Sequence, residues 1–136
     1  MVPITLTYSG DLRCEAVHGP SKVDLTTDAP IDNNGRGESF SPTDLVATAL
    51  AACLTTVMGI VAKRDGVSLD GLSANIEKHM TLQPPRRIAR IVVDLAMPKG
   101  LTADYRAKLE RAAHTCPVAL SLHPDVVQEI RFTYPD

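Results

Sequence analysis

Three cysteines are the side chains of this sequence best suited to redox or nucleophilic chemistry. Cys53 lies in the apolar run AACLT, where a free cysteine commonly packs as a small hydrophobic side chain. Position alone therefore favours core packing for Cys53. Packing also explains Cys14, because strand alternation places it on an apolar face together with Leu12 and Ala16.

Cys116 stands at a helix boundary, in the segment His114-Thr115-Cys116-Pro117, with proline at the first helical position. A sulfur at a helix N-terminus faces unpaired backbone N–H groups and the positive end of the helix dipole, and both favour the thiolate. A cysteine that is merely tolerated at a cap explains the pattern equally well, so both interpretations stay open. A Cys–His hydrolytic pair with His114 or His18 ranks low, because no acyl-transfer motif such as GxSxG is present.

The overall composition restricts the class of protein. The chain has 136 residues, of which 44% are hydrophobic and 22% charged, and this suits one soluble domain over residues 1–136. The net charge is −2 and the only basic cluster is small, so we expect no nucleic-acid partner. An odd number of cysteines and no signal peptide predict the reducing cytoplasm. No CxxC or HxxxH pair is present, so we expect no metal.

The pattern of the remaining sequence predicts the elements that must position the cysteines. Strands are expected over 1–9, 12–18, 22–27, 72–80, 87–97 and 126–134, and helices over 103–114 and 118–122. The first three strands are short, alternating and separated by Gly, Pro and Asp turns, which predicts an antiparallel meander. A surface loop rich in Asp, Asn, Gly and Ser follows over 28–40. This order of elements predicts an α+β domain.

The longest predicted element is a helix that begins after Ser41. Ser41 can cap it, Pro42 suits its first position, and Asp44 fits a capping box and the helix dipole. No charged residue occurs over 45–62, and residues 63–66 end the helix. The run is long enough to suggest a membrane span, but its small and polar residues favour a helix buried on nearly all sides. A domain of this size cannot wrap such a helix alone, so we expect a second subunit to cover it and no membrane partner.

Two motifs taken together resemble the OsmC/Ohr family of osmotically inducible and organic hydroperoxide resistance proteins. The segment SPTDL, followed by alanine-rich sequence that leads to Cys53, is similar to that family's SPxEL and AxC helix. The segment AAHTCPV around Cys116 is similar to the family's second motif. The spacing between the two cysteines and the order of the predicted elements also fit that family along essentially the whole chain.

The resemblance implies an OsmC-like fold, with antiparallel sheets and a long central buried helix, in an intertwined homodimer with active sites at the subunit interface. It implies a thiol-dependent peroxidase that reduces organic hydroperoxides, or hydrogen peroxide, without a cofactor. Cys53 would attack the peroxide bond and become a sulfenic acid, and Cys116 would resolve it as a disulfide. An external dithiol reductant, often lipoyl-linked in the Ohr branch, would restore both thiols.

Several polar residues are candidates for supporting the thiolate, which needs positive charge or hydrogen-bond donors nearby. In the family's peroxidases a glutamate usually follows the motif proline and pairs with an arginine. This chain has Thr43 at that place and Asp44 next to it, and Arg13 aligns one position away from the expected arginine. Arg36 and Glu38, in the loop before the helix, are alternative partners, and Asp44 fits a capping role at least as well.

Two other functions stay open at the level of sequence. One is a binding or stress-response module that keeps the fold and a ligand pocket but has little peroxidase turnover, which Thr43 in place of glutamate favours. The other is a cysteine-dependent hydrolase or transferase.

Overall fold

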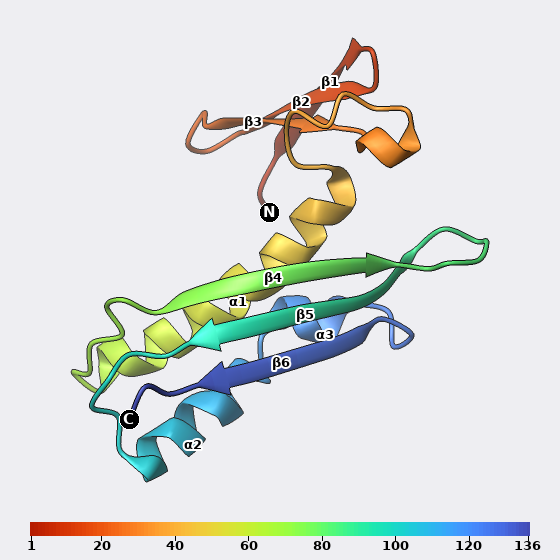
Figure 1. Ribbon diagram of the computed structural model, residues 1–136. Helices are drawn as coiled ribbons and strands as arrows, with labels where there is room; N and C mark the ends of the chain where they lie inside the picture. The colour runs from red at the N-terminus through yellow and green to blue at the C-terminus, as the bar shows by residue number, and fades with distance from the viewer. The chain divides into compact units, whose positions relative to one another are not determined.

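The computed structural model describes all 136 residues, which form two compact units, Met1–Val46 and Ala47–Asp136. The two units are described one after the other (Figure 1). The expectation that residues 1–136 make one domain stays a prediction.

The first unit is built on a three-stranded antiparallel sheet. Its strands are β1 (Ile4–Gly10), β2 (Arg13–His18) and β3 (Asp24–Asp28), in the order β1-β2-β3. The tight β1–β2 turn needs left-handed backbone, and Gly10 supplies part of it with a φ of 85°. The meander predicted from alternation and turn residues is confirmed.

The segment after β3 is a loop that is fastened back onto the sheet. It contains one short 3₁₀ turn, η1 (Ile31–Asn33). Ser39 Oγ donates to the Thr26 carbonyl at 2.7 Å, and Asp28 N–H donates to the Phe40 carbonyl at 3.1 Å. The expectation of a surface loop over 28–40 is wrong at its first residue, because Asp28 ends β3 and only 1% of it is exposed.

Helix α1 (Pro42–Arg64) begins and ends where its sequence signals predict. A reciprocal capping box starts it: Ser41 N–H donates to Asp44 Oδ2 at 2.8 Å, and Asp44 N–H donates to Ser41 Oγ at 3.1 Å. Lys63 and Arg64 lie in its last turn, where positive charge suits the helix dipole. The cap fixes the helical register that carries Cys53.

Burial of α1 is one-sided within this chain. Leu50, Leu54 and Met58 are fully buried, whereas Ile60 is 62% exposed. The helix is long and apolar enough to cross a membrane by length and composition, a test that core helices of soluble proteins also pass, and 33% of its apolar window is buried. This one-sided burial fits the expectation that a single chain does not wrap the helix alone, and coverage by a second subunit stays a prediction.

The second unit contains a three-stranded mixed sheet with helices on one face. The strands are β4 (Ser73–Met80), β5 (Ile88–Ala96) and β6 (Val127–Thr133), and the further helices are α2 (Ala103–Ala113) and α3 (Pro117–Ser121). Strands β4 and β5 are antiparallel, but β5 and β6 are parallel, which departs from the expected antiparallel sheets. The chain between β5 and β6 crosses over through α2 and α3, and such a crossover produces parallel neighbours.

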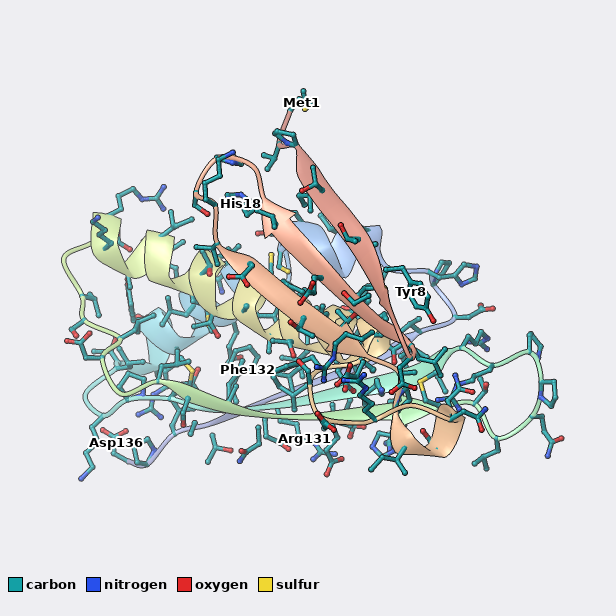
Figure 2. All side chains as sticks on the ribbon, turned by 90° about the horizontal axis from the view of Figure 1, so that it is seen from above. Met1, Tyr8, His18, Arg131, Phe132 and Asp136 are labelled. Atoms are coloured by element: carbon teal, nitrogen blue, oxygen red, sulfur yellow. The ribbon has the colours of Figure 1, made fainter.

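Strand alternation separates the core of this unit from its charged face. Ile91, Val93 and Leu95 of β5 are fully buried. Figure 2 shows Phe132 of β6 directed toward the helices and Arg131 directed away from them. Arg131 forms ion pairs with Asp94 and Glu129 on that outer face. The helices thus pack on the apolar face of the sheet, as α2 and α3 must in order to hold Cys116.

Candidate active site

The central feature of the candidate site is a pair of thiols, Cys53 and Cys116, which we call the thiol pair. Cys53 lies in the middle of α1 and is partly exposed, although its neighbour Leu54 is fully buried. Cys116 is fully buried and precedes α3. The two thiols lie close enough that Cys53 raises the pKa of Cys116, so two cysteines far apart in the sequence meet in the second unit.

Helix α3 fixes the Cys116 sulfur from its N-terminus. Cys116 is the N-cap residue, Pro117 follows at the start of the helix, and Ala119 N–H donates to Cys116 Sγ at 3.4 Å. A sulfur in this position takes the place of the oxygen of an ordinary N-cap side chain. The local sequence therefore both starts α3 and fixes the position of the Cys116 sulfur.

Burial keeps Cys116 protonated. Removal from water raises the pKa of the Cys116 thiol, and the neighbouring Cys53 thiol raises this pKa further. The N–H groups of Ala119 and Val118 oppose the shift because they favour the thiolate. The net direction is upward, so Cys116 is a thiol near neutral pH and Cys53 is the more accessible sulfur of the pair.

Cys14 belongs to the first unit, on β2, where its partners on the neighbouring strands are Tyr8 and Thr27. All three cysteines are free thiols in the structure. Neither histidine considered for a hydrolytic pair bonds to a cysteine. His114 packs edge-on against Phe132, with ring centroids 6.3 Å apart, and His18 Nδ1 lies 2.6 Å from Ser21 Oγ.

Three of the predicted support residues fall into two ion-pair groups in the first unit. Arg13 Nη2 lies 3.3 Å from Glu38 Oε2. The Arg13 guanidinium also donates two hydrogen bonds to Asp28, from Nε to Oδ1 at 2.7 Å and from Nη2 to Oδ2 at 2.8 Å. We call these three residues the Arg13 cluster. Arg36 instead pairs with Asp11, Nε–Oδ2 at 2.7 Å. The fourth candidate, Asp44, caps α1.

Asp28 is the anchor of the Arg13 cluster. The hydrogen bonds from Arg13 hold the pKa of Asp28 below its usual value against the opposing effect of burial, and the Glu38 N–H at 3.2 Å adds to this. The same pair raises the pKa of Arg13 further above its ordinary value. Arg13 is 24% exposed, so its charge is fixed in place and partly shielded from water.

Sequence reasoning missed Asp28, although a signal was present. The β2–β3 register places Arg13 directly opposite Asp28. A hairpin centred on the turn after His18 would have given this register, and an opposite-charge cross-strand pair is a common stabilising pattern. The structure groups no three His, Cys, Asp or Glu side chains in a way that could hold a metal ion.

Comparison with known proteins identifies the class to which this fold and site belong. The family model described as OsmC-like protein matches residues 35–131. The chain therefore belongs to the OsmC-like protein family, and its α+β architecture is the OsmC-like fold. The sequence has no match among curated proteins.

Solved structures agree with this assignment. A Psychrobacter arcticus protein, named provisionally as an osmotic stress induced and detoxification response protein, is 40% identical, with a TM-score of 0.92 over 98% of this chain and 96% of that one. An organic hydroperoxide resistance protein OsmC from Legionella pneumophila is 18% identical, with a TM-score of 0.76 over 98% and 96% of the two chains. One from Elizabethkingia anophelis is 14% identical, with a TM-score of 0.77 over the same shares. The last two show a shared fold.

The anchoring role of Asp28 gives a pH-dependent prediction. Because its pKa is lowered on folding, ionised Asp28 stabilises the protein fully above the unfolded pKa of about 3.9, and this stabilisation is lost as pH falls through the folded value. Asp28→Asn should lower the urea midpoint of unfolding at pH 7. The difference in midpoint between wild type and this variant should shrink as the pH falls below about 4.

The matched control is Asp24→Asn, which removes an exposed carboxylate from the same strand. It should leave the midpoint at pH 7 close to that of wild type. If the difference in urea midpoint between wild type and Asp28→Asn stays the same from pH 7 down to acid pH, the anchoring role is contradicted.

Proposed function

We propose that this protein is a thiol-dependent peroxidase that reduces organic hydroperoxides through the thiol pair. The observation that carries the proposal is the proximity of a partly exposed Cys53 to a buried, protonated Cys116, whose pKa it raises. Two thiols in contact can pass between dithiol and disulfide with little movement of the backbone. Membership of the OsmC-like family and the fold shared with hydroperoxide resistance proteins support the same chemistry.

The proposed cycle assigns a different role to each sulfur. The Cys53 thiolate attacks the terminal oxygen of the hydroperoxide, and the O–O bond breaks. The sulfur keeps this oxygen as a sulfenic acid, and the other oxygen leaves as an alcohol after protonation. Cys116 then attacks the Cys53 sulfur, the S–S bond forms, the S–O bond breaks, and water leaves. An external dithiol, which we expect to be lipoyl-linked, reduces the disulfide by thiol–disulfide exchange. No cofactor takes part in these steps.

The environment of the thiol pair favours this order of events. A thiolate must be reachable by the peroxide, and Cys53 is the exposed member. Cys116 keeps its proton because burial raises its pKa, so its S–H can donate to the Cys53 sulfur before the reaction. A cytoplasmic location would keep the resting thiols reduced.

The hydrolase alternative gains no support from the site, because His114 and His18 have other partners. A binding module with little turnover would share the fold and differ in chemistry. The two are separated by whether peroxide converts the thiol pair to a disulfide quickly and selectively.

The roles of the sulfurs can be tested by substitution. Cys53→Ser should abolish reduction of cumene hydroperoxide, whereas Cys116→Ser should leave a sulfenic acid at Cys53 that dimedone traps. Cys14→Ser is the matched control and should keep turnover. Peptide mass spectrometry should find the Cys53–Cys116 disulfide in oxidised wild type. Turnover that survives the loss of Cys53 would refute the assignment.

We keep Arg13, with Glu38 beside its guanidinium, as the candidate that the family resemblance implies for the positive charge near a peroxidatic thiolate. Two-point binding by Asp28 fixes the orientation of Arg13, whereas Arg36 pairs with an exposed Asp11. Asp44 is assigned to the helix cap.

If Arg13 has this role, Arg13→Lys should slow oxidation of Cys53. The loss should be about tenfold, since a mispositioned charge costs roughly 1–2 kcal/mol. Stopped-flow measurement with the Cys116→Ser variant isolates the step. A larger effect from Arg36→Lys would reassign the role.

We also propose that the working form is a homodimer. Ile4, Leu6 and Tyr8 of β1 are each more than 60% exposed, and α1 leaves an apolar face uncovered in the single chain. Large exposed apolar patches are rare in stable monomers and mark interaction surfaces. A second copy supplies a matching apolar surface in a symmetric contact.

Sedimentation equilibrium at micromolar concentration should give the mass of a dimer. Leu6→Glu should shift the protein to monomer, whereas Thr5→Glu should not, because Thr5 points to the opposite face of the same strand. A wild-type protein that is monomeric at this concentration contradicts the proposal.

A further inference from the structure

Gln128 is a polar residue in a row of apolar ones. On β6 it shares a face with Ile130 and Phe132, and its partner across the β5–β6 ladder is Ile91. Ile91 is fully buried, and Phe132 on the same face is directed toward the helices (Figure 2). An apolar side chain would suit this position better, and departures from the local pattern concentrate at functional sites.

The Gln128 carboxamide has a specific partner. Its Nε2 donates to the Ala119 carbonyl of α3 at 2.9 Å, in a part-buried environment. Helix α3 has only five residues, and a helix this short does not hold itself in water. Its last carbonyl groups lack partners within the helix, so Gln128 fastens α3 to the sheet at one of these groups.

Ala119 connects this anchor to the sulfur of Cys116. The same residue that accepts from Gln128 donates its N–H to Cys116 Sγ at 3.4 Å. Cys116 in turn lies close enough to Cys53 for that thiol to raise its pKa. One continuous series of contacts therefore runs from the β6 strand, through Gln128 and Ala119, to the thiol pair.

We propose that Gln128 is a positioning residue for the resolving step, a proposal that rests on the proposed peroxidase function. It holds α3 so that the Cys116 sulfur stays beside Cys53 when the sulfenic acid forms. In that step the Cys116 sulfur bonds to the Cys53 sulfur, the S–O bond breaks, and the hydroxyl leaves with the Cys116 proton as water. When Cys116 is not held, a second hydroperoxide oxidises the waiting sulfenic acid to sulfinic acid and is itself reduced to alcohol.

The test separates resolution from the first chemical step. Gln128→Met keeps the length of the side chain, removes the donor, and suits the apolar face. Disulfide formation after one equivalent of cumene hydroperoxide should slow about fivefold, the effect of losing one hydrogen bond of about 1 kcal/mol. The fraction of Cys53 found as sulfinic acid should rise at a fixed excess of peroxide. Sulfenic acid formation, measured in the Cys116→Ser background, should keep its wild-type rate.

The controls distinguish a positioning role from general damage. Gln83→Met makes the same change in an exposed loop and should resolve at the wild-type rate. Gln128→Met should melt no lower than wild type, since methionine fits the apolar face, so slower resolution will accompany unchanged stability. Gln128→Glu, which keeps the shape but puts an acceptor opposite the carbonyl, should also slow resolution and serves if the methionine variant fails to fold.

Wild-type resolution rates in both Gln128 variants would overturn this inference alone, as would an equal slowing of sulfenic acid formation. A wild-type protein that forms no Cys53–Cys116 disulfide would instead overturn the proposed function.

Discussion

The contact between the Cys53 and Cys116 thiols is the interaction on which the account of this protein depends. Neither sulfur defines a site by itself: one lies within a helix, and the other begins a helix of five residues. Their proximity requires that α1 keep its position along the helix axis and that α3 stay fixed against the sheet. The capping box at Ser41 meets the first requirement, and the Gln128–Ala119 bond contributes to the second.

Burial divides the two sulfurs chemically. Cys116 is taken out of water, its pKa rises, and it keeps a proton that it can donate. Cys53 remains open enough for a substrate to reach it. In the first unit burial acts in the same direction on Asp28, but the paired Arg13 guanidinium outweighs it and lowers the pKa of Asp28. Each group owes its protonation state to its partners as much as to its depth.

The sequence predicts the helices and strands of this chain, but it does not predict all of the contacts between them. Local signals predicted the start of α1 at Ser41 and the cap at Cys116, because capping depends on residues within a few positions of each other. Alternation predicted the strands. The parallel β5–β6 pair and the partner of Arg13 depend on register between distant segments, which no local pattern fixes. The contact between Gln128 and Ala119 likewise depends on how β6 and α3 pack together, which no local pattern predicts.

The most direct test of the account is a thiol count after a single turnover. The reduced chain has three free thiols, and one equivalent of an organic hydroperoxide should remove two of them while one equivalent of alcohol forms. The surviving thiol should be Cys14. Loss of one thiol per peroxide, or loss spread over all three cysteines, would contradict the claim that Cys53 and Cys116 work as a pair.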